Sequence, residues 1–72
     1  MKARRLNEHL RRYWLPNGWF MDYEAWVGLR LAGQRYTIWE PGGDPSGCAA
    51  YRGGGNTQAE ALATIAAVKG DT

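Results

Sequence analysis

Residues 53–68 read GGGNTQAEALATIAAV, three glycines followed by an alanine-rich segment with apolar residues at helical spacing. Thr57 and Glu60 have the spacing of a capping box, in which each side chain accepts a backbone N–H group near the other residue. Gly70 lies where a helix C-terminus often ends. The pattern therefore predicts a loop that leads into a capped helix over residues 57–69, with little side-chain bulk toward a sheet.

The basic residues are concentrated near the N-terminus. Residues 1–12 carry five basic side chains and one acidic side chain, +5 − 1 = +4, whereas the rest of the chain carries four and six, +4 − 6 = −2. Residues 2–14 (KARRLNEHLRRYW) place apolar side chains at i, i+3, i+7 and i+10, the stripe of an amphipathic helix. We expect a basic helix there, whose arginines either form a solvated face or bind an acidic partner.

The period changes at residue 19. Every odd-numbered residue in 19–31 is apolar, and this alternation predicts an extended strand with one buried face. Because thirteen residues exceed the usual strand length of about 5–6, we expect a bend or bulge near Gly28. The alternative is a helix over residues 22–32, capped by Asp22 and closed by Gly33.

Two further strands are predicted. Residues 35–40 (RYTIWE) follow a tight turn at residues 32–34, and residues 48–52 (CAAYR) follow a Pro- and Gly-rich loop at residues 41–47. The predicted fold is a single α+β domain of order α-β-β-β-α, in which two helices cover one face of a three-stranded antiparallel sheet. The expected parts of this compact domain, residues 1–72, are the basic helix at 2–14, the sheet at 19–52 and the C-terminal helix at 57–69.

Aromatic and basic side chains gather on the other face of the predicted sheet. If the odd-numbered residues form the core, Phe20 and Trp26 point outward, and Trp39 shares that face on the next strand. A monomer normally avoids such an apolar patch, and Trp and Arg dominate binding hot spots. The alternatives are that the loop at 41–47 covers one of the indoles, or that the two faces are inverted. The predicted partner-binding residues are Phe20, Trp26, Trp39, Arg30 and Arg35, with Arg4, Arg5, Arg11 and Arg12.

Features of a catalytic centre are sparse. His9 is the only histidine and Cys48 the only cysteine, so one chain cannot supply a four-ligand zinc site, and no neighbouring base would deprotonate the thiol. Asp22 and Glu24 share a strand face, where exposed carboxylates are common. The glycines at 53–55 precede a helix N-terminus, a position that binds phosphate, but the lysine and hydroxyl of a P-loop are missing. We expect a protein with no enzyme activity, no catalytic residues, no metal and no cofactor.

The compartment follows from what the sequence lacks. A single cysteine excludes an internal disulfide, which favours a reducing cytoplasm. No apolar run approaches the roughly 18–20 residues that span a bilayer, and no apolar segment of a signal peptide follows the basic N-terminus. We therefore expect a cytoplasmic protein without a membrane partner.

Two short stretches resemble known domains. The order α-β-β-β-α resembles the double-stranded-RNA-binding domain, whose last helix begins with lysines that bind phosphates, whereas this helix begins with Thr57-Gln58-Ala59-Glu60. Gly47-Cys48, Gly55-Asn56-Thr57 and Glu60-Ala61-Leu62 look like the end of HicB-type antitoxin domains, in which a Gly-Cys strand precedes a Thr-x-x-Glu-Ala-Leu helix.

As a whole, the short Trp-rich chain resembles the small orphan proteins of bacteriophages and mobile elements, a group that includes anti-CRISPR proteins. The resemblance implies a phage-encoded, non-enzymatic inhibitor that occupies a surface of a bacterial protein or ribonucleoprotein complex in the host cytoplasm. The alternative is a small nucleic-acid-binding protein that uses the basic N-terminal helix and the outward aromatic rings. A third interpretation is a homodimer that buries the same rings.

Overall fold

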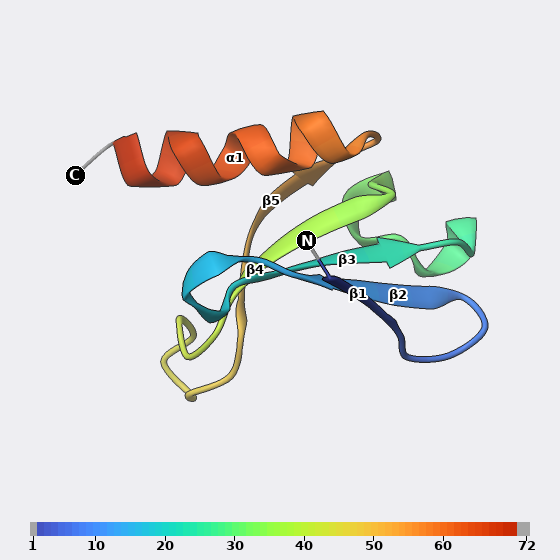
Figure 1. Cartoon of the computed structure of the whole chain (residues 1–72), viewed down its shortest axis with the longest axis horizontal. Helices are drawn as coiled ribbons and strands as arrows, with labels where there is room; N and C mark the ends of the chain where they lie inside the picture. Colours follow the sequence, from blue (N-terminus) through green and yellow to red (C-terminus); the bar gives the residue numbers. More distant parts are fainter. Residues whose placement is uncertain (1, 71–72) are drawn as a thin grey trace.

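The computed structural model of the chain describes the backbone of residues 2–70 and the side chains of residues 3–16 and 18–66. Within that range, five antiparallel strands form one sheet in sequence order, and one α-helix packs across the last two strands (Figure 1). The elements are β1 (Lys2–Arg5), β2 (Leu10–Trp14), β3 (Phe20–Glu24), β4 (Tyr36–Glu40), β5 (Ala50–Gly55) and α1 (Gln58–Gly70). Short 3₁₀ turns occupy η1 (Pro16–Gly18), η2 (Val27–Leu29) and η3 (Leu31–Gly33).

The predicted order α-β-β-β-α is wrong, because the basic segment at residues 2–14 forms a β-hairpin in place of a helix. β1 and β2 pair antiparallel, with Arg4 opposite Arg12. The turn between them is set by Asn7, whose side-chain oxygen accepts the backbone N–H groups of His9 and Leu10 at 3.0 and 2.9 Å. Such a local side-chain bond competes with helix formation, so the chain reverses where a helix would continue.

The long strand predicted over residues 19–31 is also wrong, and so is the alternative helix at 22–32. The strand ends at Glu24, and the chain then leaves the sheet through η2 and η3. The Glu24 carboxylate accepts the N–H of Trp26 at 2.9 Å, while the Arg30 guanidinium donates to the carbonyls of Glu24 and Ala25 at 3.0 and 3.2 Å. These bonds satisfy the backbone beyond β3 without a strand ladder.

The core lies between the sheet and α1. Met21 on β3 and Ile38 on β4 are completely buried, and Ala61 of α1 packs against them. Trp19 completes this buried cluster, and partly buried side chains surround it: Tyr13, Leu15, Tyr36, Leu62 and Ile65. The small side chains of the helix therefore let it lie close to β4 and β5.

The helix predicted at residues 57–69 is present as α1, and its cap has a specific geometry. The Thr57 hydroxyl oxygen accepts the N–H of Glu60 at 3.1 Å. The Glu60 carboxylate in turn accepts the N–H of Asn56 at 3.2 Å, one residue before the cap position. The two bonds satisfy donors at the start of the helix, as in a capping box.

The three glycines expected as a loop instead form the end of β5, and close packing against α1 explains two of them, Gly53 and Gly55. A Cβ at Gly55 would overlap the Cβ of Glu60 and lie 3.1 Å from the Ala61 nitrogen. A Cβ at Gly53 would lie 2.9 Å from the Thr64 Cβ, and Gly53 has a φ of +133°. Gly53 and Gly55 thus let α1 approach the strand, in place of the loop that the sequence predicts.

We expect Gly55→Ala to lower the free energy of unfolding by about 1–3 kcal/mol, because the added methyl group forces α1 away from β5. Gly28→Ala is the matched control: no atom lies within 4 Å of its added Cβ, so its stability should change by less than about 0.5 kcal/mol. Urea unfolding followed by circular dichroism measures both variants. Equal stability of the two would contradict the close contact of strand and helix.

Candidate binding surface

Four aromatic rings form a continuous row on the sheet face away from α1. Met21 and Ile38 face the helix, so the residues beside them in β3 and β4 point to the opposite face. The register aligns Trp14 with Phe20, Phe20 with Trp39, and Trp39 with Tyr51. The successive ring centroids lie 5.7, 6.4 and 5.7 Å apart. We call these four residues, Trp14, Phe20, Trp39 and Tyr51, the aromatic row.

The row is packed at its centre and open at its ends. Phe20 is only 7% exposed, whereas Trp14 is 45% and Tyr51 37% exposed. Trp39 is half-buried, and its indole N–H donates to the hydroxyl of the buried Thr37 at 2.9 Å. The hydroxyl of Tyr51 donates to the side-chain oxygen of Gln34. These bonds orient Trp39 and Tyr51 before any partner binds, which lowers the entropic cost of binding.

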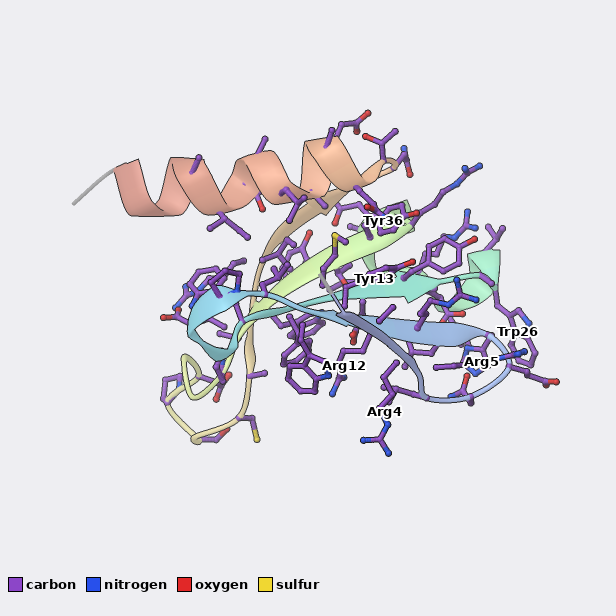
Figure 2. The ribbon with its side chains drawn as sticks, in the orientation of Figure 1. Arg4, Arg5, Arg12, Tyr13, Trp26 and Tyr36 are labelled. Carbon is purple, nitrogen blue, oxygen red and sulfur yellow. The ribbon has the colours of Figure 1, made fainter. Side chains whose placement is uncertain are left out.

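The charge beside the row is largely compensated. The guanidinium of Arg12 lies 4.0 Å above the Phe20 ring centroid and donates to both oxygens of Asp22 at 2.8 and 3.0 Å. The pKa of Arg12 is raised, first by its hydrogen bond to Asp22, so the group stays protonated. Arg4, opposite Arg12 on β1, is exposed and has no carboxylate partner among the described side chains. Figure 2 shows Arg4 and Arg12 on the side of the sheet away from α1.

The structure brings some of the predicted binding residues together and separates others. Phe20 and Trp39 are neighbours in the row, and Arg12 and Arg4 lie beside it. Trp26 lies beyond the end of β3, where it stacks on His9, and is remote from the row. Three other predicted arginines also lie apart from the row: Arg5 and Arg11 at the turn end of the β1–β2 hairpin, and Arg30 between η2 and η3. Arg35 is exposed just before β4.

Trp14 and Tyr51 belong to the surface but were not predicted. Trp14 was assigned to a helix, and no face was assigned to Tyr51 on the last predicted strand. The pairing of Trp14 with Phe20 follows once residues 2–14 are recognised as a hairpin, because β2 then lies antiparallel to β3. The signal that identifies the hairpin is Asn7, a residue that favours turns.

Both carboxylates considered for catalysis are already paired with other side chains. Asp22 pairs with Arg12, and Glu24 accepts from His9 Nδ1 at 2.8 Å, so the two carboxylates do not form an acid–base pair with each other. Cys48 is exposed in the loop between β4 and β5. Among the described residues, no group of three or more His, Cys, Asp and Glu side chains could hold a metal ion.

Comparison with known proteins gives no relative. No family model, no curated protein and no solved structure matches the chain. The resemblance to double-stranded-RNA-binding domains depends on an α-β-β-β-α order that the structure does not have. The likeness to HicB-type domains and to orphan phage proteins stays a prediction. None of the described helices is both long and apolar enough to cross a membrane.

Proposed function

We propose that this chain is a non-enzymatic binding protein that docks on a partner protein through the aromatic row. One observation carries the proposal: four contiguous rings lie on the sheet face away from α1, and both end rings are exposed. Large apolar surfaces of this kind mark interaction sites on soluble proteins. Trp, Tyr and Arg are also the residues that contribute most to binding energy.

The chemistry of the row favours a protein partner over a nucleic acid. Of the two arginines beside the row, Arg12 is paired with Asp22, and Arg4 has no ion-pair partner among the described side chains. Nucleic-acid binding requires several unpaired cations along the path of the phosphate backbone. The end rings also meet their neighbours edge-on, at interplanar angles of 66° and 65°, so they do not form a set of parallel platforms for bases. Aromatic residues with little net charge are typical of a protein interface core.

The biological role we propose is inhibition by occupation of a surface. The small phage-type proteins that this chain resembles usually act by occupying a surface of a large host complex. A rigid aromatic row rimmed by Arg4 and Arg12 suits such a role, because preformed surfaces bind with little ordering cost. The phage origin and the host target are part of this proposal.

The experiment is affinity purification of the tagged protein from bacterial lysate, with and without nuclease, at low and moderate salt. We expect a stoichiometric protein partner that survives both treatments. Trp14→Ser/Tyr51→Ser should lose it, since both side chains are exposed row members. Val27→Ser/Leu29→Ser removes exposed apolar side chains outside the row and should retain it. Recovery of nucleic acid alone, lost at moderate salt, would contradict the proposal and support the nucleic-acid alternative.

A second copy of the chain is the remaining possible occupant of the row. Light scattering during gel filtration distinguishes a homodimer from a monomer by molar mass, and we expect a monomer of about 8.0 kDa. A dimer that Trp14→Ser/Tyr51→Ser converts to monomer would assign the row to self-association and overturn the inhibitor proposal.

A further inference from the structure

The end of the sheet opposite the aromatic row carries a second exposed surface. It consists of the β1–β2 turn at residues 6–9 and the β3–β4 connection at residues 25–35, which we call the tip (Figure 1). Trp26 is 52% exposed there, Val27 71% and Leu29 57%. These side chains are therefore exposed in a connection that lies outside the strands.

Trp26 is held in place at the tip by stacking on His9, which is itself bound to Glu24. The Trp26 ring stacks on His9, with the ring centroids 4.3 Å apart and an interplanar angle of 23°. His9 Nδ1 lies 2.8 and 2.9 Å from the two carboxylate oxygens of Glu24, and the His9 carbonyl accepts the N–H of Ala25 at 2.8 Å. The turn and the connection are therefore joined, which limits any inward collapse of the apolar side chains.

A cationic pocket of about 160 Å³ lies at the tip, and its lining includes His9, on which the Trp26 ring stacks. Its lining includes Arg5, His9, Arg11, Tyr23 and Ala25, together with the carboxylate residue Glu8. Figure 2 shows Arg5 and Trp26 at the same end of the sheet.

Two arginines of this pocket are directly opposite each other. Arg5 pairs with Arg11 across β1 and β2, and like charges in that position destabilise a sheet. Neither has an ion-pair partner among the described side chains, and the Arg5 Nε–H donates to the Asn7 carbonyl at 3.3 Å. A phosphate group between the two guanidinium groups would relieve this repulsion and accept several charge-assisted hydrogen bonds.

We propose that the tip binds the surface of an anionic lipid bilayer. The phosphate of a lipid headgroup occupies the pocket between Arg5 and Arg11, and Trp26, Val27 and Leu29 insert among the headgroups and upper acyl chains. Indole rings favour this interfacial depth, and a surface-bound protein needs no spanning segment. This binding would revise the expectation of no membrane partner, which rested on the absence of a spanning run.

Charge selects the bilayer as the occupant. Around the tip, four arginines, Arg5, Arg11, Arg30 and Arg35, outnumber the two carboxylates Glu8 and Glu24, so a second copy would face like charge. A fluid anionic surface accepts exposed apolar side chains and attracts the arginines. Because the aromatic row lies at the other end of the sheet, the inference does not depend on the proposed function.

The test is co-sedimentation of the full chain with vesicles of phosphatidylcholine alone or mixed with phosphatidylglycerol. We expect binding to the mixed vesicles only. Arg5→Gln/Arg11→Gln should weaken it by about 25-fold, at about fivefold per arginine, and Val27→Ser/Leu29→Ser by at least about tenfold. Trp14→Ser, at the other end of the sheet, should bind like the wild-type chain. Circular dichroism verifies that each variant is folded.

Three results would overturn the inference. The first is no binding to the mixed vesicles, or equal binding to both kinds. The second is that excess inorganic phosphate releases the chain completely from the vesicles and also binds to the chain with the same affinity when vesicles are absent. That result would make the pocket a site for free anions. The third is that folded tip variants keep their vesicle binding but lose a captured protein, which would assign the tip to a protein partner.

Discussion

Replacement of Ile38 by alanine is expected to lower the free energy of unfolding by about 2–5 kcal/mol. Ile38 is completely buried between the sheet and α1, in the same cluster as Met21, Trp19 and Ala61. At the usual 0.05–0.15 kcal/mol per residue, a domain of 72 residues has a total stability of about 4–11 kcal/mol. The cavity left by the substitution would therefore remove a large share of it.

Urea unfolding followed by circular dichroism measures this loss. Val27→Ala is the control, because that side chain is exposed and its removal should change the stability by less than about 0.5 kcal/mol. If Ile38→Ala is as stable as the control, Ile38 does not contribute to the core. That result would contradict the packing of α1 on the sheet.

The second large effect concerns the aromatic row. With the partner protein captured from lysate, Trp14→Ala is expected to reduce the affinity by at least about 30-fold, the ratio that corresponds to a hot spot of about 2 kcal/mol. Trp14 is 45% exposed and contacts Phe20 edge-on, so its loss removes an exposed anchor while the core stays intact. Titration calorimetry measures the change in affinity.

The matched variant Arg4→Gln tests the role of charge beside the row. Arg4 is exposed and forms no described ion pair, so its removal should slow association and weaken the salt dependence more than it changes the dissociation rate. The row is not the binding surface if Trp14→Ala binds like the wild-type chain while Trp26→Ala fails to bind.

The C-terminal helix was predictable because its signal is local. Thr57 and Glu60 define the start of α1 through bonds that involve only neighbouring backbone groups. The role of the three glycines was not predictable in the same way. That role depends on how closely α1 packs on β5, and residues 53–55 alone do not indicate this distance.

The N-terminal hairpin was missed because its strands lack a purely apolar face. Helix α1 packs on β4 and β5, and no described helix covers β1 or β2. Arg12 and Trp14 therefore share one face of β2 while Arg11 and Tyr13 share the other, and the period of two that identifies a half-buried strand is absent. Apolar residues at helical spacing then favoured the wrong element.

The opposite error occurred after Glu24. The alternation at residues 19–23 is real, since Met21 and Tyr23 point to one face of β3. Its continuation to Val27 and Leu29 is unrelated to the sheet, because those side chains are exposed in a connection. The alternation at residues 19–23, which belongs to the strand, correctly predicts that Phe20 and Trp39 share a face. The alternation beyond Glu24 does not belong to a strand, and it wrongly places Trp26 on the same face.

The most direct test of the account is to record the indole N–H resonances of the ¹⁵N-labelled protein while the captured partner is added. The four tryptophans report on different places: Trp14 and Trp39 in the row, Trp26 at the tip and Trp19 in the core. Binding through the aromatic row predicts that the signals of Trp14 and Trp39 shift or broaden first, while that of Trp26 stays in place. A change in Trp26 with Trp14 and Trp39 unaffected would contradict the assignment of the uncovered sheet face as the binding surface.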